Sequence, residues 1–194
     1  TILRESVPDC YADLGYRTVS TNPCGEIPLC PYDSCRLLAI NLYSYVVNPF
    51  KPDAYFDFDL FKKHVALAQR IMDDIIDLEL EKIERIMAKI DSDPENEDVK
   101  HTESVLWQKI YKKSGQGRRT GVGITAEGDM LAALGLRYGT EEATEFAEKV
   151  HQTVALSAYR SSVEMAKERG AFEVYDSERE KNNPFINRLR EADP

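Results

Sequence analysis

The feature that most constrains the fold is a helical repeat of apolar residues that begins after Asp59. These residues recur at three- and four-residue steps: Phe61, Val65, Ala68, Met72, Ile75, Leu80, Ile83, Met87 and Ile90. The one five-residue step, from Ile75 to Leu80, predicts a break between two helices. A second stripe (Phe146, Val150, Val154, Ala158 and Met165) predicts a long helix that Thr140 caps and Gly170 ends. The chain is therefore expected to be rich in helix.

Shorter elements are predicted around these helices. The apolar run Leu37–Tyr43 fits a buried strand, and Ala171–Tyr175 fits a short one. Asp93 is the expected N-cap of a further helix, with Pro94 at its first position. Residues 79–115 are strongly charged and predict a solvent-exposed helical hairpin, with Trp107 in the hairpin's own core.

Composition excludes several classes of protein. The 194 residues are 42% hydrophobic and 30% charged, as in a globular protein, and the net charge of −9 without a basic block argues against nucleic-acid binding. No apolar run approaches the roughly 20 residues of a membrane span. The chain starts at Thr1 without a signal peptide and ends just after a helical pattern. We therefore expect a piece of a longer protein without a membrane partner.

All four cysteines, Cys10, Cys24, Cys30 and Cys35, lie in the first fifth of the chain. Disulfides that staple a secreted domain are usually spread more widely, so we expect a cytoplasmic protein with reactive, zinc-binding or inert buried thiols. The spacings contain no Cys-x-x-Cys pair, which weakens the zinc interpretation. Three histidines stand singly on helical patterns, are expected to be surface or packing residues, and receive no metal role: His64, His101 and His151.

The segment Asn22-Pro23-Cys24-Gly25-Glu26 carries the clearest chemistry. Pro23 and Gly25 favour a tight turn, and alternating residues of an extended segment project to the same side. Asn22, Cys24 and Glu26 are therefore expected to converge on one small molecule. A glycine-rich stretch, residues 115–123, is a weaker candidate for a phosphate-binding loop, because its spacing fits neither the dinucleotide nor the P-loop pattern.

These motifs resemble those of ribonucleotide reductases. Four segments are similar to the family's motifs and occur in the family's order: 22–29, which resembles the finger loop; 34–42; 118–125; and 158–172. The resemblance implies a helix-rich α/β fold, part of a ten-stranded α/β barrel with the finger loop inserted at its centre. On this view residues 1–194 are a single partial catalytic-barrel domain. Residues 1–58 hold the finger loop and strand region, 79–115 form the hairpin excursion, and 116–194 contribute barrel helices and a strand.

The resemblance also implies a role for each motif residue. Cys24 matches the cysteine that becomes a thiyl radical and takes the 3′ hydrogen of the ribose, and Glu26 matches the carboxylate that accepts the 3′-hydroxyl proton. Asn22 matches the amide that hydrogen-bonds the sugar hydroxyls. Cys35 matches one of the two thiols that reduce the 2′ carbon and end as a disulfide. The family's second thiol lies upstream, and Cys10 or Cys30 could replace it only if folding brought one close.

Cys35 follows Cys24 by eleven positions, and this spacing looks most like the adenosylcobalamin-dependent class. The continuation Ile27–Leu29 and the stretch Gly123–Gly128 agree with it, although Glu127 departs from the family's usual residue. The alternative class receives its radical from a diiron partner subunit. The implied partners are a ribonucleotide, the remainder of the reductase chain and a dithiol reductant of the thioredoxin kind. Two other hypotheses stay open: a zinc-binding interaction module of the four cysteines, and an inactive helical scaffold.

Overall fold

The computed structural model describes residues 11–23, 25, 27–34, 36–181 and 183–192. The chain divides into two compact units. The first unit comprises residues 1–36, 73–120 and 171–194, and the second comprises residues 37–72 and 121–170. No helix among the described residues is long and apolar enough to cross a bilayer.

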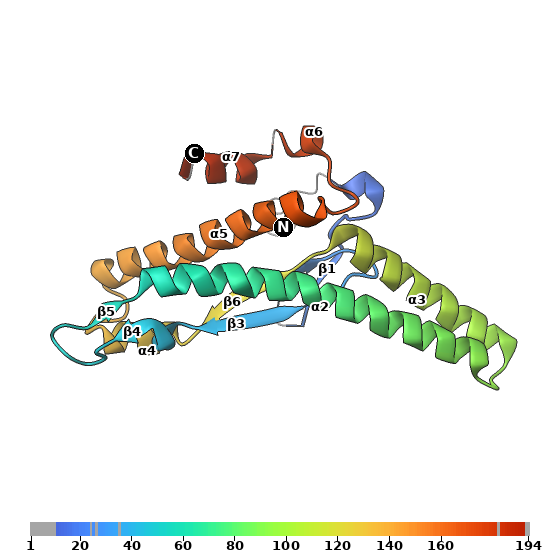
Figure 1. The fold of residues 1–194 in the computed structure, drawn as a ribbon, viewed down its shortest axis with the longest axis horizontal. Coiled ribbons are helices and arrows are strands. Elements are labelled where there is room, and N and C mark those ends of the chain that lie inside the picture. Colours follow the sequence, from blue (N-terminus) through green and yellow to red (C-terminus); the bar gives the residue numbers. More distant parts are fainter. Residues whose placement is uncertain (1–10, 24, 26, 35, 182, 193–194) are drawn as a thin grey trace. The chain divides into compact units, whose positions relative to one another are not determined.

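A pair of parallel strands forms the framework of the second unit. Strand β3 (Leu37–Asn41) pairs with β6 (Gly121–Thr125), so that Leu37 lies opposite Gly121 and Asn41 opposite Thr125 (Figure 1). The remaining elements of this unit follow one strand or the other: the 3₁₀ turn η2 (Leu42–Tyr45), β4 (Val46–Val47), β5 (Tyr55–Phe56), the first part of α2 (Phe58–Ser92), α4 (Glu127–Ala133) and α5 (Glu141–Arg169). Strands β4 and β5 form a small antiparallel pair of their own.

The core of this unit lies where the helical stripes meet the residues after β3. Five side chains are fully buried there: Leu42, Phe61, Val65, Met130 and Val150. The ring of Phe61 packs edge to face against Tyr45 and Phe56, with centroids 4.9 and 5.1 Å apart, and the Tyr45 and Phe56 rings are tilted at 5.8 Å. The Ser161 hydroxyl of α5 donates to the Ala66 carbonyl of α2 at 2.8 Å, which joins the two long helices. The apolar stripe predicted for 140–170 is thus the buried face of α5.

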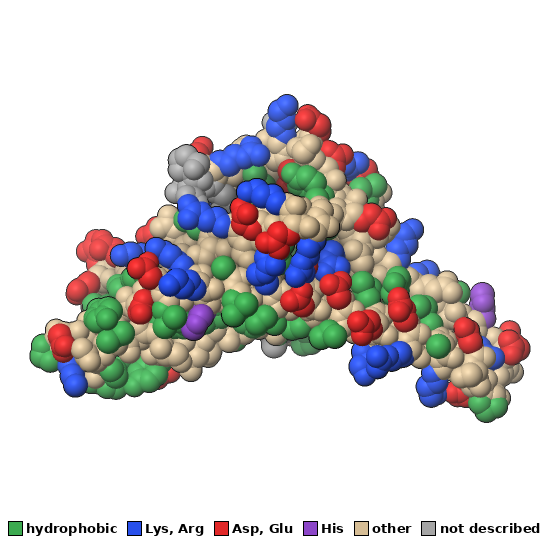
Figure 2. Space-filling model, viewed as in Figure 1, with side chains coloured by type: hydrophobic (Ala, Val, Ile, Leu, Met, Phe, Trp, Pro, Cys, Tyr) green, Lys and Arg blue, Asp and Glu red, His purple; other side chains and the backbone are tan. Residues whose placement is uncertain are grey.

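The first unit is built on a helical hairpin. Helix α2 (Phe58–Ser92) contributes its second part, and α3 (Glu97–Gly117) returns alongside it (Figure 1). Tyr111 of α3 donates to Glu84 of α2 at 2.8 Å. Figure 2 shows acidic and basic side chains interspersed over this arm, as the charged hairpin prediction requires. The unit also contains η1 (Ala12–Leu14), β1 (Ser20–Thr21), β2 (Pro28–Leu29), α6 (Ser177–Glu180) and α7 (Pro184–Ala192).

The predicted break between Ile75 and Leu80 is wrong, because α2 is one continuous helix of 35 residues. The buried residue of that turn is Ile76, which is 0% exposed, whereas Ile75 is only half-buried. With Ile76 in place of Ile75, the buried positions Met72, Ile76 and Ile83 follow steps of four and seven residues, and the stripe is unbroken.

Two local predictions are also wrong. Helix α3 is capped by Asn96, whose side chain accepts from the Asp98 amide at 2.8 Å, while Asp93 accepts from Lys89 on the preceding helix. Residues 171–175 form a turn instead of a strand, with the Tyr175 amide donating to the Phe172 carbonyl at 2.9 Å. The predicted caps at the ends of α5, Thr140 and Gly170, are confirmed.

The prediction of a helix-rich α/β fold is confirmed. The described residues form three two-stranded sheets, and no closed barrel is present among them. The ten-stranded barrel and the assignment of residues 1–194 to one partial barrel domain stay predictions.

Leu78 tests whether α2 is continuous, because it lies at the position of the predicted break and is 59% exposed. Proline inside a helix removes a hydrogen bond and clashes with the preceding turn, at a cost of about 3 kcal/mol or more. We expect Leu78→Pro to lower the melting temperature by roughly 6–12 °C, measured by circular dichroism. Leu78→Ala is the control, because it keeps the helix. Equal melting temperatures for the two variants would support the predicted helix break between Ile75 and Leu80.

Candidate functional site

The Asn22–Glu26 motif lies in a β-hairpin of the first unit. Strands β1 and β2 are antiparallel, with Ser20 opposite Leu29 and Thr21 opposite Pro28. The Val19 amide donates to the Leu29 carbonyl at 3.0 Å and extends the pairing beyond the strands. The motif therefore occupies the connection between two hydrogen-bonded strands.

Asn22 organises this connection. Its side chain is buried, at 6% exposure for the residue, and its Oδ1 accepts from the Ile27 amide at 2.9 Å. The Asn22 amide in turn donates to the Ile27 carbonyl at 3.1 Å, and the Asn22 carbonyl accepts from Gly25 at 3.0 Å. Gly25 has φ +83°, a conformation that glycine adopts readily, and the predicted tight turn is confirmed. Asparagine suits this position because its side chain imitates a backbone peptide group.

The other predicted site residues are not placed by the structure. Cys24, Glu26 and Cys35 lie outside the described residues, as does Cys10. Their convergence on one substrate stays a prediction. What the structure does describe is the surroundings of these positions in the first unit.

A buried carboxylate lies at the turn before position 35. The Asp33 side chain is 4% exposed and accepts from Arg119 Nη1 at 3.0 Å. The Ser34 amide donates to the other carboxylate oxygen at 3.0 Å, and the Cys30 thiol donates to Oδ2 at 3.3 Å. Asp33 therefore joins the turn to the segment that precedes β6.

Cys30 is a protonated thiol in this network. Burial and the neighbouring Asp33 carboxylate raise the pKa of the Cys30 thiol to about 11. A thiol with so high a pKa is a poor zinc ligand and a poor nucleophile at neutral pH. The zinc-binding module is therefore not favoured.

Arg36, directly after position 35, is the most connected buried charge of the first unit. Its side chain is 5% exposed and forms an ion pair with Glu79 of α2. Arg36 Nη2 donates to Ser114 Oγ of α3 at 2.8 Å, and Nη1 donates to the Arg119 carbonyl at 2.9 Å. The guanidinium thus connects residue 36 to three segments of the first unit that are distant in sequence.

The segment 118–125, which resembles a motif of the family, has a structural role as well. Arg118 ends α3 in the left-handed region, at φ 42°, and its guanidinium binds Asp73 at 2.8 Å and Asp77 at 2.7 Å. The glycine-rich stretch 115–123 ends helix α3 and enters strand β6, so it does not open a helix as a phosphate-binding loop would. Arg36 and Asp33 were not predicted as site residues from the sequence, although a charged residue next to an apolar strand was the available signal.

The histidines show packing and surface contacts. His64 is exposed on α2, and its Nδ1 lies 3.0 Å from the hydroxyl of the core residue Tyr45. His151 Nε2 lies 3.5 Å from Glu127 Oε1, with 55% of the histidine side chain exposed. His101 is exposed on α3.

Cys30 gives a prediction about pH. Its pKa of about 11 exceeds the ordinary value of 9.0, so the folded state keeps the proton over this range and the associated stability is lost as pH rises from about 9 to 11. We expect iodoacetamide alkylation of native Cys30, followed by peptide mass spectrometry, to have its midpoint near pH 11. Asp33→Asn removes a charge that raises the pKa and should move the midpoint downward. A midpoint near pH 9 in the unsubstituted protein would contradict the buried network.

Arg36 gives a prediction about stability. Arg36→Leu leaves the Glu79 carboxylate without its cation, and breaking a buried pair in this way costs about 3 kcal/mol or more. We expect urea unfolding to show this loss as a lower free energy of unfolding. Arg85→Leu, on an exposed part of α2, is the control and should change the free energy of unfolding by less than about 0.5 kcal/mol. A similar small change for both variants would show that the Arg36 contacts contribute little.

The chain matches known proteins over most of its length. Residues 14–191 match the family model of the ribonucleotide reductase barrel domain. A vitamin B12-dependent ribonucleoside-diphosphate reductase of Thermoplasma acidophilum is 36% identical over 163 residues, which are 84% of this chain and 18% of that protein. A protein of the same description from Mycobacterium tuberculosis is 31% identical over 163 residues, 84% of this chain and 19% of its own length. A ribonucleoside-diphosphate reductase subunit alpha of Chlamydia pneumoniae is 28% identical over 159 residues, 80% of this chain and 12% of its own.

This chain thus spans less than a fifth of the length of these relatives. The family model nevertheless covers nearly all of it, including the hairpin, the Asp33 turn and both strands of the parallel pair. The chain therefore belongs to the ribonucleotide reductase barrel-domain family.

Proposed function

We propose that this chain supplies the radical-cysteine loop of a vitamin B12-dependent ribonucleoside-diphosphate reductase, and that it acts together with the remainder of a longer reductase chain. The observation that carries the proposal is the Asn22–Glu26 motif in a hydrogen-bonded turn, within a segment that the family model matches from residue 14 to 191. The reaction is the reduction of a ribonucleotide to a deoxyribonucleotide.

The proposed chemistry begins at the 3′ carbon of the ribose. The Cys24 thiyl radical takes the 3′ hydrogen atom, so that an S–H bond forms, a C–H bond breaks and the radical passes to the sugar. Glu26 accepts the proton of the 3′ hydroxyl. Both events occur at one carbon and its oxygen, so the two side chains must be held at nearly the same point. Fixed geometry of this kind lowers the barrier by several kcal/mol.

Asn22 is suited to hold the sugar. Its Oδ1 is engaged by the Ile27 amide, which fixes the plane of the carboxamide. The two N–H donors of Nδ2 belong to the same plane and are the groups that can donate to a sugar hydroxyl. A donor oriented in this way loses little side-chain entropy when the substrate binds.

Cys35 is proposed as one thiol of the pair that reduces the 2′ carbon. Two thiols supply two electrons and become a disulfide, while the bond between the 2′ carbon and its hydroxyl breaks and the hydroxyl leaves as water. A dithiol reductant of the thioredoxin kind then reduces the disulfide. Cys30 is a poor partner for this disulfide, because its thiol is buried, hydrogen-bonded to Asp33 and raised in pKa to about 11. The partner cysteine is therefore assigned to a part of the reductase outside this segment.

Adenosylcobalamin, which supplies a radical by cleavage of its cobalt–carbon bond, enters the proposal through the names of the relatives. The described residues do not fit it by themselves. Two hollows of about 300 and 370 Å³ lie on the second and first units, and both are at the small end for a drug-sized ligand, which cobalamin exceeds. Its binding site is therefore assigned to the remainder of the reductase.

The proposal is tested in the intact reductase with Cys24→Ser. A serine hydroxyl does not form the radical under these conditions, so we expect turnover to fall to background while nucleotide binding, measured by equilibrium dialysis, is unchanged. Glu26→Gln should lower turnover by about 10²–10⁴-fold, the usual contribution of a positioned acid–base group.

Cys30→Ser is the matched control and should keep turnover, because Cys30 has no part in the proposed chemistry. Retained activity in Cys24→Ser would remove this cysteine from its role. Retained activity in Glu26→Gln as well would favour the inactive-scaffold hypothesis for this segment.

A further inference from the structure

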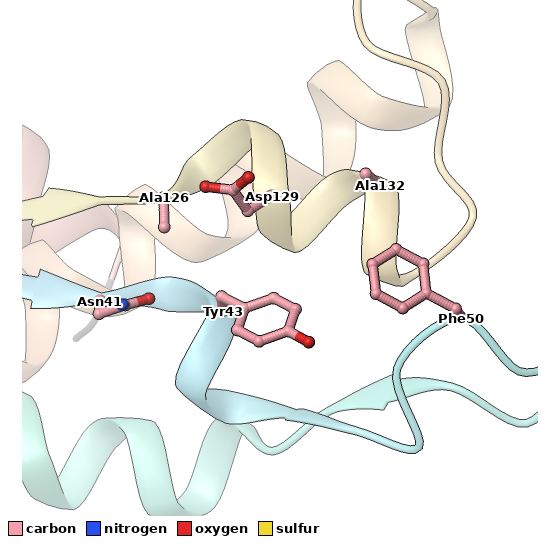
Figure 3. A pocket seen from close by; sticks show the side chains of 6 residues that line it. All are labelled: Asn41, Tyr43, Phe50, Ala126, Asp129 and Ala132. Atoms are coloured by element: carbon pink, nitrogen blue, oxygen red, sulfur yellow. The ribbon is translucent and has the colours of Figure 1, made fainter.

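The second unit has a hollow at the carboxyl ends of its two parallel strands. It has a volume of about 300 Å³ and is lined by Asn41, Tyr43, Phe50, Ala126, Asp129 and Ala132. Figure 3 shows Asn41 and Tyr43 on one side and Ala126, Asp129 and Ala132 on the other, with Phe50 at one end. The carboxyl ends of parallel strands are where α/β proteins commonly bind their ligands.

Phe50 is held in this hollow against its local preferences. The residue is 70% exposed, and its φ of +63° is unusual for a bulky side chain. Its amide donates to the Ala133 carbonyl at 2.8 Å, which fixes the conformation. Ala126, across the hollow, also has a positive φ, +62°. A large ring that gains no burial from a strained backbone is explained if it contacts a ligand.

A second ring accompanies Phe50. Tyr43 is 37% exposed, and its ring centroid lies 6.5 Å from that of Phe50, with the planes 41° apart. Both rings line the same hollow, so a planar molecule that enters it meets aromatic surface from two side chains.

The polar side chains of the hollow are available to a ligand. Asn41 and Asp129 are exposed, and neither side chain has a hydrogen-bond or ion-pair partner among the residues that the structure describes. Asp129 offers acceptors only, whereas the Asn41 carboxamide offers both donors and an acceptor. The complementary ligand edge therefore carries N–H donors for Asp129 together with an acceptor for Asn41.

We infer that this hollow binds an amino-substituted heteroaromatic ring, the chemical class of adenine, cytosine and guanine. The ring stacks on Phe50 and Tyr43, and its edge, which has amino donors beside a ring-nitrogen or carbonyl acceptor, meets Asp129 and Asn41. The guanidinium of an arginine from a protein partner fits less well, because it has donors but no acceptor for the Asn41 amide.

This site is separate from the proposed thiol chemistry. None of the lining residues is assigned a part in the reduction. The inference consequently does not rest on the proposed function, and a Cys24→Ser protein without turnover should retain the site.

The test is a titration of the intact protein with phosphate-free nucleosides, followed by saturation-transfer NMR. We expect adenosine, cytidine and guanosine to bind more tightly than inosine and uridine, which lack the amino group. Phe50→Gly removes the ring and suits the positive φ, so it should preserve the fold and weaken binding about tenfold or more. Asp129→Asn loses the charge and one acceptor oxygen and should weaken the preference for guanosine over inosine.

The controls are Tyr138→Ala, an exposed ring outside the hollow, and Asp59→Asn, an exposed carboxylate on α2. Nucleoside that binds at other sites contributes equally to the signal of every variant, so it does not affect the comparison of variants. Equal affinities for amino and non-amino nucleosides, or equal effects of control and hollow variants, would overturn the inference. A third result would also overturn the inference. In it, the protein binds arginine amide and none of the nucleosides, and Phe50→Gly and Asp129→Asn both weaken the binding of arginine amide.

Discussion

The first unit depends on the buried guanidinium of Arg36. A guanidinium removed from water loses its hydration, and the ion pair with Glu79 compensates for this only together with the hydrogen bonds to Ser114 and to the Arg119 carbonyl. An apolar side chain could fill the same space with similar stability. An apolar side chain could not fix the orientation of the groups that it contacts, because hydrophobic contact is non-directional. Arginine at this position is therefore best explained by orientation, because its directed hydrogen bonds fix residue 36 against helices α2 and α3 of the first unit.

The same reasoning separates the cysteines. Cys30 lies in a buried network whose charge and burial hold it as a thiol, so the fold itself takes it out of redox chemistry. Asn22 shows the opposite arrangement, because one end of its carboxamide is used to build the turn while the other keeps its donors. A loop that positions one of its own side chains through the backbone needs few supporting residues. This economy is consistent with the short span between β1 and β2.

Sequence could predict the features that local chemistry decides. Thr140 and Gly170 mark the ends of α5 because a cap depends on a few neighbouring residues, and the tight turn at Gly25 was predicted for the same reason. The break at Ile75 was wrong because two adjacent isoleucines offered alternative registers, and only packing shows that Ile76 is the buried one. Residues 171–175 had strand-forming side chains, but a strand also requires a partner, which no local pattern supplies. Arg36 was missed because all of its contacts are distant in sequence.

The strand pair β3–β6 explains why a resemblance confined to short motifs could identify the family. The segments 34–42 and 118–125 are far apart in sequence, yet Leu37–Asn41 and Gly121–Thr125 lie in register, residue against residue. Arg36 and Arg119, which precede the two strands, are joined by a hydrogen bond. Motifs that pair in this way constrain each other, since a change of register in one strand would move every side chain of that strand to the other face. The similarity of both segments to one family therefore concerns one paired structural element with a fixed register, and not only two short stretches of sequence.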